Sequence, residues 1–501
     1  MLKALEEIRA FVWGAPALLM ILGTGLFLTL ATGFAQLCFL PRAWNHFWKK
    51  LRADDEGRGV SSYQSLCTAL AATVGTGNIA GVAGAIAIGG PGAIFWMWVC
   101  AFFGMIVKFA EATLATHFQR KGVDGEYYGG PMYMIQYGMG KRWKWLACLY
   151  CFFGVVAACG IGNATQVNAV LDGVNSAILA IGGKSSFAAD FLLGAVLAAL
   201  VGYMLLGGSS RIGKIAERLV PISSVLYILL GIGVLLACYE RIPQAFASIL
   251  RGAFSPKSVT GGVIGSAFLA LRVGVARGVF TNEAGMGTAS ISYACTKAAH
   301  PVEQGLMGII EVFVDTVVIC TITALVVLCS DVLIPFGTDE GAALTCRAFS
   351  SVYGDWVNIP LALFLACFAF ATMLGWGLYG ARCAQFLFGE KAWKYFVCLQ
   401  IAVVSVSAML KTGTVWLLAE ILNGLMAIPN LVALVVLSPV LVCLVKHYKK
   451  KKGIQDADGG TYESFNQCQP LRTFSYEKVS SPCGGSGATG KKDLSSEYRP
   501  A

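Results

Sequence analysis

The sequence predicts an all-α polytopic membrane protein with about eleven transmembrane helices. Three observations carry this prediction: 56% of the 501 residues are hydrophobic, only 13% are charged, and long apolar runs recur along the chain. An ordinary soluble domain has about twice this share of charged residues, and each helical span needs about 20 apolar residues. A soluble enzyme is therefore excluded, as are a collagen-like chain and a wholly disordered one.

The apolar runs divide the chain into eleven expected spans followed by a polar tail. The spans run near 12–37, 62–89, 92–118, 145–172, 188–207, 217–238, 260–290, 303–330, 357–387, 393–410 and 416–445. Together they make one membrane domain over residues 1–445. The tail, over 446–501, is rich in Gly, Ser and charge, which predicts a mostly disordered cytoplasmic segment.

The net charge of +10 is explained by orientation in a membrane. Lys and Arg number 21 in one set of alternate loops and eight in the other set. The positive-inside rule places the richer set in the cytoplasm, so the N-terminus lies outside, the tail lies inside and the number of spans is odd. Because the basic residues form no arm interleaved with aromatic residues, nucleic acid is not an expected partner. A multi-pass protein of the cell (inner) membrane is expected.

The 17 cysteines and four histidines give no sign of a metal centre. Most of the cysteines lie inside apolar runs, where cysteine behaves as a small hydrophobic residue. The isolated pair Cys148 and Cys151 lacks the second pair that a structural zinc site needs. No cofactor is therefore expected, and the N-terminus lacks the pattern of a cleavable signal peptide.

Two glycine-interrupted segments occupy matching places in the chain. Beyond the extra N-terminal helix over 12–37, ten spans remain, which divide into sets of five over 62–238 and 260–445. One set opens with Thr68–Gly92 and the other with Gly261–Gly287, and the two segments begin on opposite sides of the membrane. Paired interrupted helices in inverted repeats are the best sequence pointer to the binding site of a transporter.

The first interrupted segment contains the stretch Thr73–Gly81, which has three glycines within seven residues. Glycines lower the cost of unwinding a helix, and unwound carbonyls and half-helix N-termini bind Na⁺ and carboxylates. A close helix–helix contact also explains glycines, but such a contact needs neither Thr73, Thr76 nor Asn78. A dinucleotide-binding loop is disfavoured because no β-strand precedes the glycines.

Three strings resemble the signature of the sodium:alanine (alanine or glycine:cation) symporter family. They are Thr73–Gly81, the run Gly89–Val99 with its Gly-Gly-Pro-Gly turn and tryptophans, and the run Ala276–Ala289. The resemblance covers roughly residues 10–445. It implies a leucine-transporter-like fold, in which ten core helices form a five-plus-five inverted repeat with broken first and sixth core helices. It also implies Na⁺-coupled uptake of alanine or glycine.

The resemblance further implies where the ion and the substrate bind. The sodium ligands would be the backbone carbonyls of Ala71 and Val74, the amide oxygen of Asn78 and the hydroxyl of Thr372. The substrate carboxylate would lie against Asn78 and the backbone N–H groups of Gly75, Thr76 and Gly77. Thr372 alone would more often bond to its own helix backbone, but it lies one turn from Trp376 on the same helix face, a spacing that matches the family.

Three further side chains would line the substrate pocket by the same resemblance. Gln166 would contact the substrate, because an uncharged amide both donates and accepts hydrogen bonds, which suits a zwitterion. Phe268 would form a pocket wall just before a helix break expected near Gly274, and Trp376 would keep the cavity small. Read from the residues alone, Gln166 also fits an interhelical hydrogen bond and Phe268 also fits ordinary packing.

Several charged residues fall inside the expected spans, where burial costs several kcal/mol. Gating and structural ion pairing explain five of them equally well: Arg272, Arg277, Glu283, Glu311 and Asp315. Glu311 and Asp315, four residues apart, are placed to face Arg272 or Arg277. A second group, near the cytoplasmic ends of spans, is expected to extend its charged ends towards water: Lys108, Glu111 and Arg382.

These observations favour a secondary active symporter, not an enzyme, with Na⁺ as the co-transported ion and a small amino acid as substrate. A proton-coupled transporter of the same fold is an alternative. An ion channel is a less favoured alternative, because channels also use carbonyls in broken helices. No phosphate-binding loop or intramembrane catalytic pair is visible in the sequence. Membrane lipid is the expected surrounding, and the oligomeric state stays open, with a monomer plausible.

Overall fold

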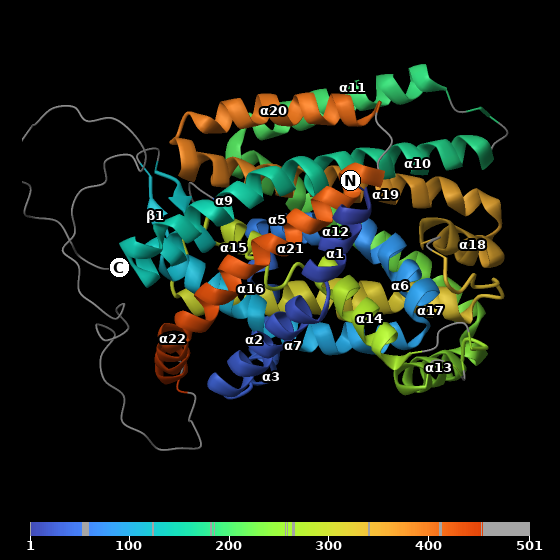
Figure 1. The fold of residues 1–501 in the computed structure, drawn as a ribbon, viewed down its shortest axis with the longest axis horizontal. Helices are drawn as coiled ribbons and strands as arrows, with labels where there is room; N and C mark the ends of the chain where they lie inside the picture. Colours follow the sequence, from blue (N-terminus) through green and yellow to red (C-terminus); the bar gives the residue numbers. More distant parts are fainter. Residues whose placement is uncertain are drawn as a thin grey trace, which may run out of the picture.

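The computed structural model describes residues 2–453 apart from 53–59, 123–124, 181–182, 185, 256, 258, 263–265, 339–340, 410–412 and 452. Nearly all of the described chain is helical; several long helices, among them α10, α11, α19 and α20, run nearly side by side along the long axis, and α21 crosses them obliquely (Figure 1). The described part also contains a small antiparallel hairpin, in which β1 (Arg120–Lys121) pairs with β2 (Tyr127–Tyr128). All-α architecture is therefore confirmed.

Helices occupy every one of the expected spans. They are α2 (Ala15–Ala31); α5 (Ser62–Thr73), η1 (Gly77–Gly81) and α6 (Val82–Gly89); α7 (Gly92–His117); α9 (Lys144–Cys159), η4 (Gly160–Ala164) and α10 (Thr165–Ala180); α11 (Phe187–Leu205); α12 (Gly208–Ala237); α14 (Ala267–Asn282) and α15 (Thr288–Tyr293); α16 (Pro301–Val312), η7 (Phe313–Cys320) and α17 (Thr321–Cys329); α19 (Asn358–Phe388); α20 (Ala392–Ser407); and α21 (Gly413–Val436).

Length and composition allow six of the described helical segments to cross a membrane, or up to eight if two bent pairs each form one span. The first bent pair joins α5 to the segment Gly77–Gly89 at 52°, and the second joins α21 to α22 (Ser438–Lys451) at 59°. The apolar stretches Pro16–Ala31 and Ala392–Ser407 are shorter. The count of eleven spans and the inverted repeat stay predictions.

Short helices fill several of the expected loops. Further short helices, of which α3 lies mostly within the expected span 12–37 and α22 begins within 416–445, are α1 (Leu2–Val12), α3 (Ala35–Cys38), α4 (Leu40–Arg52), α8 (Pro131–Tyr133), η2 (Met134–Met139), η3 (Lys141–Trp143), η5 (Tyr239–Arg241), α13 (Ile242–Phe254), α18 (Gly341–Tyr353), η8 (Asp355–Val357) and α22. The chain bends after Val436 and α22 continues to Lys451, past the expected end of the last span; the boundary between membrane domain and tail stays a prediction. The remainder of the expected tail lies outside the described residues apart from Gly453.

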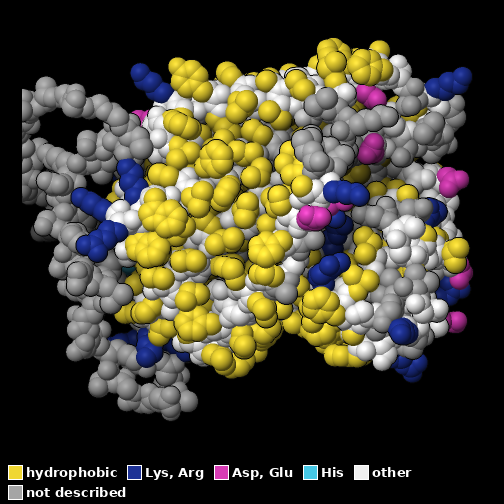
Figure 2. Space-filling view, viewed as in Figure 1, with side chains coloured by type: hydrophobic (Ala, Val, Ile, Leu, Met, Phe, Trp, Pro, Cys, Tyr) yellow, Lys and Arg dark blue, Asp and Glu magenta, His cyan; other side chains and the backbone are white. Residues whose placement is uncertain are grey.

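The helix bundle exposes a large apolar surface. Figure 2 shows hydrophobic side chains covering the middle of the visible face, with most Lys and Arg towards its left and right ends. Many large hydrophobic side chains are exposed, among them Leu192 at 65%, Leu229 at 57% and Leu363 at 61%. A soluble protein rarely exposes so large an apolar surface, so these side chains fit contact with lipid acyl chains.

Glycines let α14 lie very close to α7. A Cβ atom added at Gly274 would stand 2.2 Å from the carbonyl oxygen of Ala93, and one added at Gly278 would stand 2.9 Å from Cβ of Cys100. The expected break near Gly274 is therefore wrong: α14 runs unbroken from Ala267 to Asn282. These glycines remove side chains between two packed helices, which is the other common use of small residues in membranes.

Candidate functional site

The first helix break lies where the sequence predicts it. Helix α5 ends at Thr73, Val74 takes an extended backbone (φ −74°, ψ 106°), and the chain re-enters a helix through the π-helical segment η1. The amide N–H of Gly75 donates to Oδ1 of Asn78 over 2.9 Å. The Asn78 side chain thus replaces an acceptor that the broken helix has lost, which is how interrupted membrane helices satisfy their backbone.

Thr372 of α19 lies directly against this break. Its hydroxyl donates to the backbone carbonyl of Ala71 over 3.0 Å, and a Cβ atom at Gly75 would stand 3.1 Å from the same hydroxyl oxygen. The structure therefore brings Ala71, Thr372 and Gly75 together, and Val74 is fully buried beside them in the chain. A carbonyl and a hydroxyl at an unwound helix form a partial set of hard oxygen ligands for Na⁺.

Asn78 also contacts a carboxylate that the sequence analysis did not place there. Its Nδ2 donates to Oδ1 of Asp315 over 2.7 Å and lies 3.2 Å from Sγ of Cys320. Oδ2 of Asp315 accepts from the hydroxyl of Thr316 over 2.7 Å. The expected pairing of Asp315 with Arg272 or Arg277 is not observed. Asp315 is fully buried, so this carboxylate adds a negative charge next to the first break.

A second break follows α14. Glu283 ends the helix in the left-handed region (φ 53°), Gly285 (φ 94°) and Gly287 (φ 74°) continue the turn, and α15 begins at Thr288. Left-handed backbone is easy for glycine and unfavourable for glutamate. Contacts of its side chain hold Glu283 there: Oε2 accepts from the hydroxyl of Thr288 over 2.6 Å.

Side chains from two other helices brace this second break. Oε1 of Glu111 on α7 accepts from the amide N–H groups of Gly285 (2.9 Å) and Gly287 (3.1 Å). Nδ2 of Asn430 on α21 donates to the same oxygen over 2.7 Å and lies 2.9 Å from the carbonyl of Gly285. Charge-assisted bonds of this kind are about twice as strong as neutral ones, so Glu111 fixes the shape of the break.

Trp376 connects the second break to η4. The indole is fully buried, and its Nε1 donates to Oε1 of Glu283 over 2.9 Å. Opposite, a Cβ atom at Gly162 would stand 2.3 Å from Cβ of Trp376, so η4 and α19 are in direct contact here. A bulky side chain held on both sides limits the space between them.

Replacing Trp376 with Phe is expected to lower the stability of the protein by about 1–3 kcal/mol, because the buried Oε1 of Glu283 loses its donor. The ring itself is largely retained, so packing against Gly162 is only slightly reduced. The measurement is thermal unfolding of the detergent-purified protein. The partly exposed Trp393, which donates to the carbonyl of Leu205, provides a control: Trp393→Phe is expected to have a smaller effect. Equal effects would contradict the role given to the Glu283 contact.

Gln166 and Phe268 have different positions in the structure. Gln166 lies in the first turn of α10, directly after η4, and is buried; its Nε2 is 3.4 Å from the hydroxyl of Thr165. Phe268 is the second residue of α14 and is 58% exposed. Of these predicted pocket residues, the structure thus buries Gln166 and Trp376 and leaves Phe268 at the surface.

The charged side chains expected to reach water are instead buried. Lys108 and Glu111 have no exposed surface, and Nζ of Lys108 pairs with Oε1 of Glu311 over 2.9 Å. Arg382 is 4% exposed, pairs with Glu126 of the hairpin and stacks over the ring of Tyr128 at 4.2 Å. The expectation fails because each cation has a carboxylate from another segment, which no single-helix pattern reveals.

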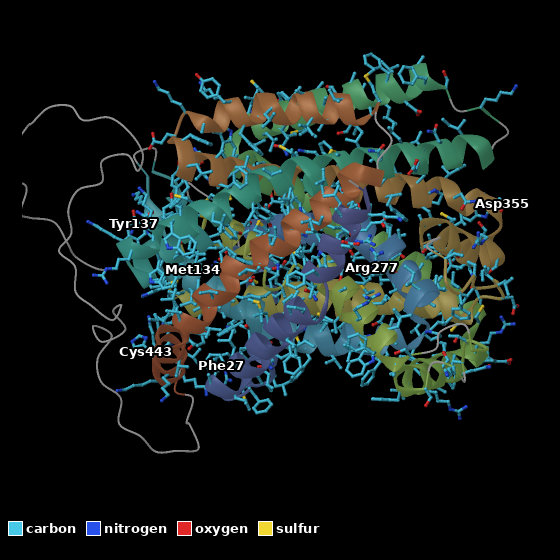
Figure 3. All side chains as sticks on the ribbon, in the orientation of Figure 1. Phe27, Met134, Tyr137, Arg277, Asp355 and Cys443 are labelled. Carbon is cyan, nitrogen blue, oxygen red and sulfur yellow. The ribbon has the colours of Figure 1, made fainter. Side chains whose placement is uncertain are left out.

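Arg277 lies on α14 and is partly buried. Figure 3 labels it between Met134 and Tyr137 towards one end and Asp355 towards the other. Glu283 forms the second break itself. The roles of Arg272 and Arg277 stay open.

The sequence that forms these two helix breaks also matches a known protein family. The profile of the sodium:alanine symporter family matches residues 1–461. The chain belongs to this family. It is therefore a polytopic membrane transporter for amino acids and a cation, and the resemblance inferred from the three strings is confirmed.

Two relatives in the sodium:alanine symporter family are named for different amino acids. The sodium/alanine symporter AgcS of Methanococcus maripaludis is 42% identical over 450 residues, which cover 89% of this chain and 96% of that protein. The probable sodium/glutamine symporter GlnT of Bacillus subtilis is 36% identical over 445 residues, which cover 88% of this chain and 89% of that protein. The match in each case spans almost the full transporter.

A solved structure supports the fold of this family member. The chain is similar to MhsT, crystallised in complex with L-phenylalanine, with a TM-score of 0.53 and 15% sequence identity. The match covers 78% of this chain and 99% of MhsT. At this identity the likeness shows the fold, and it agrees with the leucine-transporter-like architecture expected from the sequence.

Sequence reasoning missed the side chains that hold the breaks. Asp315, Glu111 and Asn430 each contact a break from another helix, and none was assigned to the site. A signal was present, because an ionisable residue in the middle of an apolar span is a functional candidate by default. Asp315 met that description, whereas Glu111 lies near the end of its expected span and Asn430 is an uncharged amide.

Proposed function

We propose that this chain is a secondary active symporter that couples inward Na⁺ movement to the uptake of a small neutral amino acid, alanine or glycine. The observation that carries the proposal is the contact between the Thr372 hydroxyl and the Ala71 carbonyl at the first helix break. Membership of the sodium:alanine symporter family supports it. The proposed ion ligands are the carbonyls of Ala71 and Val74, the Asn78 amide and the Thr372 hydroxyl.

Coupling in this proposal is a difference in affinity. Na⁺ at the first break favours the conformation that also binds the amino acid, and each ligand then raises the affinity of the other by the same factor. Movement of one helix bundle against the rest gives alternating access. We place the protein in the cell membrane with its N-terminus outside, as the loop charges predict.

The substrate class follows from the side chains at the breaks. The stretch Thr73–Gly81 has no acidic residue, so carbonyl dipoles or Gln166 would receive the substrate ammonium, and a zwitterion is preferred over an amine without a carboxylate. The backbone N–H groups of Gly75, Thr76 and Gly77, with Asn78, would receive the carboxylate. The fully buried Trp376 favours alanine or glycine over a larger cargo such as the glutamine in the name of GlnT.

Uptake of radiolabelled alanine into proteoliposomes tests the proposal. An inward Na⁺ gradient is expected to drive accumulation, and Asn78→Ala is expected to remove it, because the variant loses the amide that closes the first break. Uptake driven equally by a proton gradient without Na⁺ would replace Na⁺ by H⁺ as the coupled ion. Accumulation that never exceeds equilibrium under either gradient would contradict symport and favour a channel.

Replacing Thr372 with Val is expected to lower Na⁺-driven uptake at least about tenfold, because a ligand contribution of about 1.4 kcal/mol corresponds to a factor of ten. Valine has the shape of threonine without the hydroxyl. Thr372→Ser keeps the hydroxyl and is the matched control, expected to retain the Na⁺ dependence. The measurement is the Na⁺ concentration for half-maximal uptake, and an unchanged value in Thr372→Val would remove this residue from the ion site.

A further inference from the structure

Four ionisable side chains meet in the interior behind the second break. Lys108 and Glu111 lie one turn apart on α7, Glu311 comes from α16, and Glu283 is part of the break itself. Nζ of Lys108 contacts Oε1 of Glu311 at 2.9 Å, and the hydroxyl of Tyr293 donates to Oε2 of Glu311 over 2.9 Å. We call Lys108, Glu111, Glu283 and Glu311 the buried cluster.

The formal charges of the buried cluster do not balance. Three carboxylates face one ammonium, and Lys108 pairs directly with Glu311 alone. Glu111 and Glu283 accept hydrogen bonds only from neutral groups of the described chain. All four side chains are at most 3% exposed. Burying an uncompensated carboxylate costs several kcal/mol, so the cluster needs a further positive charge.

Two buried polar atoms of the cluster region lack a hydrogen-bond partner in the described part of the chain. They are Oε2 of Glu111 and the hydroxyl of Tyr379 on α19. Tyr379 is 2% exposed, and the charges of Glu283, Glu311 and Glu111 all act on its hydroxyl. An unpartnered oxygen at Glu111 marks the position where the missing positive charge would bind.

A proton fits this position better than a metal ion. Among the described residues, no three or more His, Cys, Asp or Glu side chains are arranged to hold a metal. The Lys108 ammonium also repels a second cation, because its charge acts on Glu111 and Glu283 as well as on Glu311. A proton on Oε2 of Glu111 needs no further ligands and removes one negative charge.

The protonation state of Glu111 is linked to the shape of the second break. As a carboxylate it accepts from Gly285, Gly287 and Asn430 at Oε1. Protonation weakens these bonds, because hydrogen bonds to an ionised acceptor are about twice as strong as those to a neutral one. The groups that face Glu111 from the packed helices are Lys108, Glu311, Glu283, Tyr150 and Tyr379.

We propose that Glu111 is a proton-binding site, and that its proton is released to solvent when the amino acid binds. The proposal rests on the proposed function, because it links Glu111 to the substrate through the second break, Glu283 and Trp376. Substrate binding requires an ordered break, the ionised form of Glu111 braces that break, and binding therefore favours loss of the proton. By linkage, deprotonation raises substrate affinity by the same factor.

Calorimetry of alanine binding measures the released proton directly. Purified full-length protein in detergent, with saturating Na⁺, is titrated with alanine in two buffers of different ionisation enthalpy at several pH values around neutrality. The wild type is expected to give buffer-dependent heats that correspond to proton release. Its alanine affinity is expected to rise with pH, by at most about tenfold per pH unit for one proton.

Carboxamide variants locate the proton. Glu111→Gln is expected to abolish both the buffer dependence and the pH dependence of affinity. Asp331→Asn, whose exposed carboxylate pairs with Arg241, lies outside the buried cluster and is expected to keep them. If Glu111→Gln does not fold, Asn430→Val serves instead: it removes one donor from the Glu111 carboxylate and is expected to move the pH of maximal buffer dependence upward.

The outcomes separate this proposal from the proposed function. Identical heats in both buffers for the wild type at every pH would overturn the proton site and leave alanine binding intact. Buffer dependence retained in Glu111→Gln, or an unmoved pH profile in Asn430→Val, would assign the proton to another group and overturn the proposal. Absence of any heat with alanine would overturn the proposed substrate, and this proposal with it.

Discussion

Replacing Lys108 with Met is expected to destabilise the folded protein by about 3–5 kcal/mol, because the fully buried Glu311 carboxylate loses the one cationic partner it has among the described residues. Native proteins are stable by only about 5–15 kcal/mol, so the variant should unfold at a much lower temperature and give little folded protein. Thermal unfolding in detergent, followed by size-exclusion chromatography, measures the loss.

The double variant Lys108→Met, Glu311→Gln provides the matched control. It removes both charges and keeps an amide oxygen that accepts from Tyr293. Replacing both members of a buried pair is often nearly neutral, so the double variant is expected to recover most of the stability. A double variant as unstable as Lys108→Met would show that charge compensation is not what Lys108 supplies.

Replacing Gly287 with Ala is expected to lower alanine uptake at least about tenfold, since a disturbance of 1.4 kcal/mol at the site already has that effect. The residue has φ 74°, which costs a non-glycine residue about 1–2 kcal/mol. An added Cβ atom would stand 2.3 Å from Cγ of Pro131 and 2.7 Å from Oδ1 of Asn430. The brace of the second break must therefore shift.

Gly33→Ala is the control that separates the cost of a positive φ from the steric clash expected at Gly287. Gly33 has a similar φ of 65°, and an added Cβ atom would meet nothing within 4 Å. The variant is expected to lose a little stability and to keep its uptake. Initial rates of uptake at equal amounts of reconstituted protein give the comparison, and equal rates for Gly287→Ala and Gly33→Ala would contradict the importance of the second break.

The first break was predictable from the sequence, whereas the position of the second was not. In the stretch Thr73–Gly81, polar side chains accompany the glycines, and Asn78 supplies the replacement acceptor within three residues. Gly274 and Gly278 prove to be contact positions against α7 within an unbroken helix. The real break uses Gly285 and Gly287, whose polar partners come from other helices, so a local pattern does not reveal it.

Burial of charge was the property that the sequence predicted least well. Lys108, Glu111 and Arg382 stand near the ends of apolar runs, a position that usually lets long side chains reach water. Their partners Glu311, Asn430 and Glu126 are distant in sequence, and only packing brings them together. Hydropathy reports how strongly a segment prefers lipid. It contains no information about which helices pack against one another.

The short helices also escaped prediction. Helix α18 lies in an expected loop, yet its Thr345 donates to the carbonyl of Ile79 over 3.0 Å and so covers the first break. Its sequence has no apolar run long enough to cross a membrane, and such runs were the pattern on which the expected helices rested. The all-α class, the run of helical segments and the first break were therefore accessible, while the elements that enclose the site were not.

The brace of the second break has a consequence for biogenesis. Glu111 and Asn430 are 319 positions apart along the chain. During synthesis, α7, α14 and α15 emerge long before α21. Until α21 is inserted, Glu111 contacts the turn but Asn430 is not yet present to hold Glu111. Maturation of the substrate site then becomes a late event, completed when the last long helix leaves the insertion machinery. A product of premature termination ahead of α21 would carry every glycine of the turn and still lack its final shape.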